Sequence, residues 1–129
     1  MFGLSIISKG IKMDKILKDK WLKALRSGKF KKGIQALRVK GNKSYSYCCL
    51  GVLCQITDPS KWIKNGVEQT SNGKPCVPYD FHGIPDSKRI PDIVLDEYGL
   101  TSESRCALIQ INDSSKNFDK VIKYIEKNL

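Results

Sequence analysis

The sequence lacks a long apolar run, contains a single histidine, and has few acidic residues in its first half. No stretch approaches the roughly 18 consecutive apolar residues of a membrane helix, and residues 1–7 lack the basic start of a signal peptide. We therefore expect a cytoplasmic protein without membrane association. The five cysteines are odd in number, and adjacent Cys48 and Cys49 are poorly placed to bridge each other, so reduced thiols are expected.

The shortage of acidic residues makes the first half of the chain strongly basic. Residues 1–60 contain 13 Lys or Arg and three Asp, whereas residues 61–129 contain ten residues of each sign. The formal net charge of +10 therefore belongs entirely to the first half. A field of this sign attracts nucleotides, nucleic acid and acidic proteins. The alternative is that the lysines only keep a small protein soluble.

Length and apolar periodicity predict one small α+β domain. A chain of 129 residues is long enough for a single continuous core. Apolar residues recur at helical spacing over residues 13–27 and 118–129, which predicts amphipathic N- and C-terminal helices. We assign residues 13–129 to the domain and residues 1–12 to a flexible N-terminal extension.

The middle of the chain combines strands with a buried helix. Residues 34–39 and 44–47 flank a glycine-containing turn, which predicts a short antiparallel β-hairpin after a basic link at 29–33. Residues 48–56 are apolar on nearly every side, which predicts a central buried helix. The expected fold is a central buried helix with a short antiparallel hairpin or sheet and amphipathic N- and C-terminal helices.

Turn residues punctuate the second half. Residues 60–90 are expected to be irregular, with one short hairpin around Asn72-Gly73. Short helices are predicted over 91–99, where Pro91 suits a first turn, and over 101–111. The polar residues 112–115 predict a break before the C-terminal helix.

Three of the five cysteines lie in the stretch YCCLGVLC, residues 47–54. A structural zinc site needs two ligand pairs, and Cys49 with Cys54 forms the one close pair, so neither a metal nor another cofactor is expected. A cysteine-dependent hydrolase would join Cys49 to the single histidine, His82. His82 lies among turn residues, however, and we favour small apolar core residues over catalytic thiols.

The candidate ligand-binding residues gather around the predicted hairpin. Tyr45 and Tyr47 are two apart, so their rings share one face of a strand and can stack on a base. A guanidinium grips two phosphate oxygens at once, which favours Arg26 and Arg38 as anion ligands. The predicted site comprises Arg26, Lys32, Arg38, Lys40, Tyr45, Tyr47, Asn112 and Asp113.

Each of these candidates has a structural alternative. The tyrosines can pack inward while the lysines merely face water. Asn112 and Asp113 can cap the C-terminal helix through an Asx turn instead of facing a ligand.

Three segments resemble the motifs of a family of small uncharacterised proteins in tailed bacteriophages and prophages. They are Trp21–Gly28 (WLKALRSG), Tyr47–Cys54 (YCCLGVLC), and Ile111–Asp113 followed by Phe118 and Ile122–Ile125. The family patterns are WxxALRSG, CCLGVLC, LND and FxxIAxxI, so the chain departs from them at Ile111 and at the residue after Ile122. The resemblance implies a phage origin, a host-cytoplasm setting and an accessory role against host defences.

Together these observations predict a phage accessory protein that binds a small anionic host ligand without catalysis. A cyclic or NAD-derived nucleotide is the expected class, and its capture would antagonise host defence signalling. The alternative is a protein that binds nucleic acid or an acidic host protein through an open basic face. The cysteine-dependent hydrolase is the third hypothesis. A homo-oligomer is compatible with each, because small pockets form readily across a two-fold axis.

Overall fold

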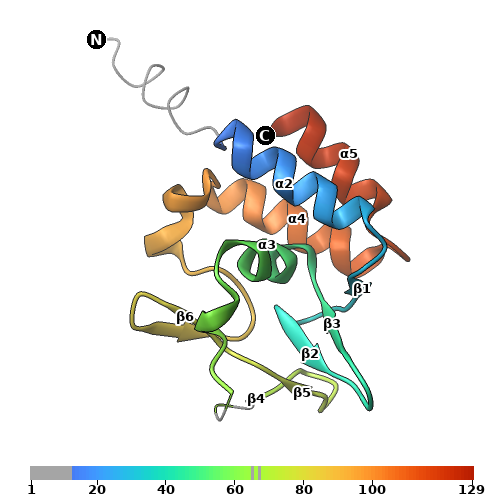
Figure 1. The fold of residues 1–129 in the computed structure, drawn as a ribbon, viewed down its shortest axis with the longest axis vertical. Coiled ribbons are helices and arrows are strands. Elements are labelled where there is room, and N and C mark those ends of the chain that lie inside the picture. The colour runs from blue at the N-terminus through green and yellow to red at the C-terminus, as the bar shows by residue number, and fades with distance from the viewer. Residues whose placement is uncertain (1–12, 65, 67) are drawn as a thin grey trace.

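The computed structural model describes residues 13–64, 66 and 68–129, which form an α+β domain (Figure 1). Helices cover one side, a small sheet forms the other, and α3 (Cys49–Thr57) lies between them. The predicted extension, residues 1–12, lies outside the described residues. None of the described helices combines the length and apolar character that crossing a bilayer requires.

The helical side is built from α2, α4 and α5, as the apolar periodicity predicted at both ends of the domain. α2 begins after Asp14, whose carboxylate accepts a hydrogen bond from the Leu17 N–H at 3.0 Å, and α5 buries its apolar stripe. α2 contacts α3 and α5, and α4 contacts the same two helices. The bounds are α2 Lys15–Arg26, α4 Ser102–Ser114 and α5 Asp119–Asn128.

Helix α3 is buried on all sides over its first six residues, so the prediction of a central buried helix is confirmed. The Trp21 Nε1–H of α2 donates to the Cys49 carbonyl at 2.9 Å. A Cβ atom at Gly51 would lie 1.7 Å from the Leu37 carbonyl oxygen, so glycine is required for this approach. The chain entering the hairpin therefore packs directly on the helix backbone.

The predicted hairpin forms two strands of a five-stranded sheet with the order β1-β3-β2-β5-β4. β2 and β3 are antiparallel, as predicted, although residues 34–37 precede the strand. The predicted basic link contains β1, which pairs in parallel with β3, and this pairing was not predicted. The bounds are β1 Lys31–Lys32, β2 Arg38–Lys40, β3 Tyr45–Tyr47, β4 Glu68–Gln69 and β5 Pro75–Cys76.

The segment predicted to be irregular is more ordered than expected. The hairpin around Asn72-Gly73 is confirmed as β4 and β5. A second hairpin, β6 (Tyr79–Phe81) and β7 (Ile84–Asp86), was not predicted. Its two-residue turn places both His82 and Gly83 at positive φ, a turn geometry that suits the twist of a hairpin. The 3-10 helix η1 (Pro59–Lys61) lies at the start of the segment. The short helix predicted over residues 91–99 forms as the 3-10 helix η2 (Asp92–Tyr98), with Pro91 as its N-cap.

The break predicted at residues 112–115 is wrong, because α4 continues to Ser114. Asn112 is buried in the last turns of this helix, and its side chain bonds to other segments instead of competing for its own backbone. The Asx-turn capping role proposed for Asn112 is likewise wrong, because α5 begins after Phe118 without a side-chain cap.

Candidate functional site

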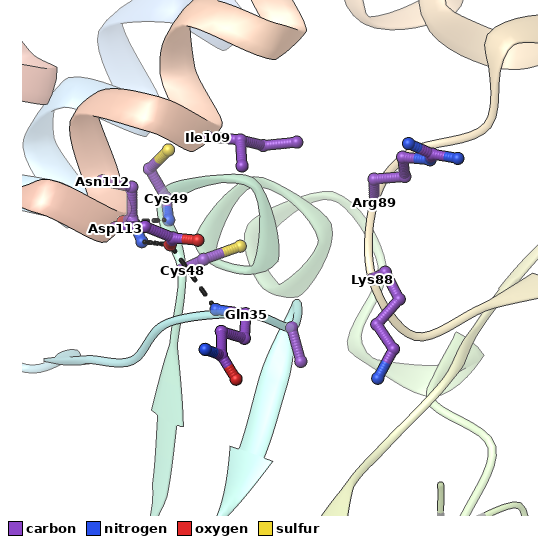
Figure 2. Close-up of a pocket in the computed structure, with 9 residues that line it drawn as sticks. Gln35, Cys48, Cys49, Lys88, Arg89, Ile109, Asn112 and Asp113 are labelled. Atoms are coloured by element: carbon purple, nitrogen blue, oxygen red, sulfur yellow. Dashed lines mark hydrogen bonds between the residues drawn. The ribbon is translucent and has the colours of Figure 1, made fainter. Parts of the chain in front are cut away.

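A cavity of about 230 Å³ lies where the hairpin entry, the start of α3 and the end of α4 meet (Figure 2). Lys88 and Arg89 come from a segment on the opposite side of this cavity from Asp113. We call it the α3 pocket. It is lined by Gln35, Ala36, Cys48, Cys49, Lys88, Arg89, Ile109, Asn112 and Asp113.

The Asn112 amide in this pocket is fully engaged within the chain. Its Oδ1 accepts the Cys49 N–H at 3.0 Å, and its Nδ2 donates to the Gly33 carbonyl at 2.9 Å and to Asp113 Oδ1 at 3.0 Å. The side chain has no exposed surface. Asn112 therefore joins the hairpin entry, α3 and α4, and its polar atoms are already used.

The thiols in the α3 pocket remain protonated near neutral pH. Burial raises the pKa of Cys48 to about 11, although nearby backbone N–H groups of Gly51 and Leu50 oppose this shift. Burial also raises the pKa of Cys49 well above its ordinary value, and its Sγ–H donates to the Leu108 carbonyl at 3.8 Å. A neutral, enclosed thiol is a weak nucleophile.

The structure does not bring Cys49 and His82 together as a catalytic pair. Cys49 is buried beneath α4, whereas His82 is exposed at the β6–β7 turn, where its Nε2 lies 2.9 Å from Glu97 Oε2. Within residues 13–64, 66 and 68–129, no three His, Cys, Asp or Glu side chains group closely enough to hold a metal ion.

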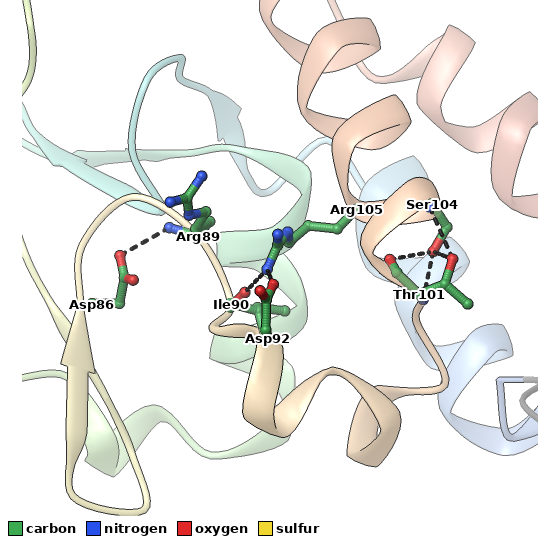
Figure 3. Close-up of polar contacts among 7 residues, drawn as sticks. All are labelled: Asp86, Arg89, Ile90, Asp92, Thr101, Ser104 and Arg105. Carbon is green, nitrogen blue, oxygen red and sulfur yellow. Dashed lines mark hydrogen bonds and ion pairs between the residues drawn. The ribbon is translucent and has the colours of Figure 1, made fainter.

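A second polar cluster ties α4 to η2 (Figure 3). Arg105 is buried, and its Nη1 donates to the Ile90 carbonyl at 2.8 Å and pairs with Asp92 Oδ1 at 2.6 Å. Thr101 and Ser104 form a capping box at the start of α4. Arg105 is not among the residues that line the α3 pocket, and its contacts fix the orientation of α4 relative to η2.

A different hollow, of about 280 Å³, lies against the face of the hairpin that carries the two tyrosines. In the register of β2 and β3, Arg38 pairs with Tyr47 and Lys40 pairs with Tyr45, so all four side chains share this face. We call it the Arg38 hollow. It is lined by Arg38, Lys40, Tyr45, Gln55, Pro59, Trp62, Lys64 and Val77.

The Arg38 guanidinium is held by aromatic rings. Its central carbon lies 3.5 Å from the Tyr45 ring centroid, 4.9 Å from Trp62 and 5.8 Å from Tyr47. Arg38 Nε is buried without a hydrogen-bond partner in the described part of the chain. In that same part, no carboxylate pairs with the guanidinium, and its Nη atoms are neither buried nor bonded. Its charge and its terminal Nη donors are therefore available to a ligand, whereas the buried Nε is not.

The floor of the hollow is rigid. Trp62 packs against Tyr79 with ring centroids 4.9 Å apart and against Tyr47 at 6.2 Å. Its Nε1–H donates to Gln55 Oε1 at 2.8 Å, which fixes the orientation of that amide. Sequence reasoning missed Trp62, Gln55 and Lys64, because α3 and the following turn bring them to the hairpin. A tryptophan just beyond the Asp-Pro end of a buried helix was the one available signal.

The remaining predicted residues lie elsewhere. Arg26, at the end of α2, forms an ion pair with Glu126 of α5. Lys32 Nζ donates to the Asn112 carbonyl at 2.7 Å. Asp113 belongs to the α3 pocket, where its Oδ1 accepts from Asn112. The structure thus unites Arg38, Lys40, Tyr45 and the largely buried Tyr47. Lys32 is the register partner of Tyr47 but bonds to the Asn112 carbonyl, and Arg26, Asn112 and Asp113 do not line the hollow.

Comparison with known proteins gives one match. A family model described as a domain of unknown function, DUF8296, matches residues 13–129. No curated protein and no solved structure matches the chain.

Proposed function

The chain belongs to the DUF8296 family over residues 13–129, and we propose that this domain binds a small anionic ligand of nucleotide type in the Arg38 hollow without transforming it. The observation that carries the proposal is the Arg38 guanidinium, which stacks on Tyr45 but has no carboxylate partner in the described residues. A charged group held without a counterion in a partly enclosed site favours an anionic guest.

The charges around the hollow support a phosphate-bearing ligand. Lys40 and Lys64 line it together with Arg38, and none of its lining residues is acidic. The guanidinium can offer two parallel N–H donors to phosphate oxygens, while each ammonium acts as a mobile point charge. Three cations with no carboxylate among the lining residues create a positive potential, which is strongest inside a concave site.

The rings support a planar ligand group beside the phosphate. Tyr45 is 37% exposed, so part of its ring remains open although Arg38 covers it. Bases stack on aromatic rings and on guanidinium planes, and the hollow presents both. Because Gln55 Oε1 is occupied by Trp62, the amide nitrogen of Gln55 is left to donate to a base or sugar oxygen.

Binding without catalysis fits the lining of the hollow, which contains no thiol, imidazole or carboxylate among its side chains. The biological part of the proposal rests on the motif resemblance. In it, a phage-encoded protein sequesters a cyclic or NAD-derived host nucleotide in the host cytoplasm and so weakens defence signalling.

Titration calorimetry with adenosine monophosphate, a cyclic dinucleotide and cyclic ADP-ribose tests this function. We expect at least one to bind with a micromolar Kd, and adenosine and inorganic phosphate to bind at least about tenfold more weakly, because each supplies half of the contacts. Dissociation constants above about 1 mM for every nucleotide would contradict the proposal.

Two substitutions locate the binding. Arg38→Ala removes both the charge and the stacked plane, and Arg38→Lys keeps the charge alone, so we expect losses of at least about tenfold for both, with the larger loss for alanine. Arg26→Ala is the matched control, because it removes an arginine that is paired with Glu126 outside the hollow. Equal losses from Arg26→Ala and Arg38→Ala would move the site away from the hollow.

A further inference from the structure

The other face of the β2–β3 hairpin carries a different surface. Val39 and Ser46 are register partners and point away from the face that holds Arg38 and the tyrosines. They line a broad, shallow depression of about 870 Å³. We call it the lysine basin, and its relevant lining residues are Lys31, Ile34, Val39, Lys40, Ser46 and Lys74.

The lysine basin is positively charged and unneutralised. None of its lining residues is acidic, and no ion pair involves Lys31, Lys40 or Lys74 in the part of the chain that the structure describes. Lys32 also borders the basin, but its ammonium group is engaged with the Asn112 carbonyl. Free ammonium groups of Lys31 and Lys74, from two separate segments, therefore lie at this surface, whereas the Lys40 side chain points to the opposite face of the hairpin.

The lining of the lysine basin is partly apolar. Ile34 is 39% exposed, and it borders the basin together with Val39 and Pro75. Apolar side chains next to charged ones are also found together in protein interfaces. An exposed isoleucine contributes binding energy only when the partner also has an apolar group to bury.

We propose that the lysine basin docks an acidic polypeptide segment that also carries aliphatic side chains. Charge complementarity selects an acidic partner, and the exposed side chain of Ile34 selects one with aliphatic residues. Single-stranded nucleic acid fits less well, because no aromatic ring and no arginine lines the basin. Bases would have nothing to stack on there, whereas both groups are present on the opposite face.

Fluorescence anisotropy with a labelled peptide of sequence EELEDIEE tests the proposal on the full chain. We expect a Kd of about 10–100 µM that weakens as salt is added, because the contact is shallow and largely electrostatic. The peptide EESEDSEE has the same charge without the aliphatic residues and should bind at least about fivefold more weakly. An oligothymidylate of equal charge should bind more weakly than EELEDIEE.

Charge reversal locates the contact. Lys31→Glu with Lys74→Glu should weaken binding of EELEDIEE at least about tenfold. Lys120→Glu with Lys127→Glu makes the same charge change on exposed positions of α5 and should alter binding less than about twofold. Amide shifts of Ile34 and Ser46 should move in NMR spectra during the titration, while the Trp62 indole signal stays in place.

Each opposite result overturns the docking proposal. These results are a Kd above about 1 mM for EELEDIEE, equal affinity for EESEDSEE, or binding of oligothymidylate as tight as that of EELEDIEE. Equal losses from the two charge-reversal variants, or shifts at Trp62 without shifts at Ile34, would also overturn it. Circular dichroism of both variants establishes that a loss of binding is not a loss of fold.

Discussion

The α3 pocket and the Arg38 hollow are both small cavities lined by polar side chains, but these side chains differ in whether they bond to groups of their own chain. In the α3 pocket, Asn112 forms three hydrogen bonds to groups of its own chain. In the hollow, Arg38 has an unpartnered Nε and terminal donors that no described residue engages. Buried polar groups are normally satisfied within the chain, as at Asn112, so the first pattern explains a fold. The second leaves the exposed terminal donors of Arg38 open to a ligand.

Asn112→Ala is expected to give the largest effect, on stability alone. It leaves the Cys49 N–H and the Gly33 carbonyl buried without partners, at a cost of about 3–5 kcal/mol of unfolding free energy. Urea unfolding followed by tryptophan fluorescence measures the loss. Asp113→Ala is the control, since that residue is exposed and should lose less than about 1 kcal/mol. Similar values for the two variants would refute a structural role specific to Asn112.

Gly51→Ala should come next, although alanine is normally the better helix former. The added methyl group would overlap the Leu37 carbonyl oxygen, so α3 or the hairpin entry must shift, at a cost of about 2–3 kcal/mol. Gly73→Ala is a useful comparison, because a Cβ there meets no atom within 4 Å and any cost comes from the positive φ. If Gly51→Ala stabilised the protein in the same urea assay, the close approach of the Leu37 carbonyl to Gly51 would be contradicted.

Sequence reasoning succeeded where the signal is local. The periodic apolar residues of α2 and α5, the all-round apolar α3 and the turn between β2 and β3 each depend on neighbours in the chain. Such patterns indicate which face of a helix or strand is buried, and burial of that face stabilises the element.

Partners distant in sequence were not predictable in the same way. Asn112 meets groups 63 and 79 residues away, and nothing in the local sequence NDSS indicates that its amide will bond there instead of ending a helix. The parallel pairing of the two-residue β1 has no periodicity to detect. Trp62 reaches the hollow through its bridge to Tyr79, a contact that depends on the fold of both segments.

Arg38→Ala should weaken ligand binding and leave stability nearly unchanged, which is the opposite of the effect expected for Asn112→Ala. We expect its unfolding free energy to change by less than about 1 kcal/mol, because a lost cation–π contact is offset by removing an unpartnered buried nitrogen. Affinity for whichever nucleotide calorimetry identifies should nevertheless fall at least about tenfold, or about 1.4 kcal/mol. Asn112→Ala, assayed well below its unfolding midpoint, should retain that affinity. If both variants lose stability and binding in parallel, the distinction between the two cavities fails.

The smallest expected effect is the part of the pH dependence of stability that comes from Cys48 in the α3 pocket. Burial raises the pKa of Cys48 from 9.0 to about 11 in the folded protein. Below pH 9 the thiol is protonated in both states, so its contribution to stability is fully present. Above pH 9 the unfolded chain loses the proton first, and stability falls as pH rises toward 11.

Cys48→Ser isolates this titration, because serine does not ionise in this range and its oxygen can still accept the Gly51 N–H. Between pH 8 and pH 10 the native protein should lose about 1 kcal/mol more than the variant in urea unfolding. Nucleotide affinity at the Arg38 hollow should show the same pH profile in both proteins, because Cys48 does not line it. Identical stability profiles would mean that water reaches the thiol, and the α3 pocket would then become a site whose polar groups are open to a ligand.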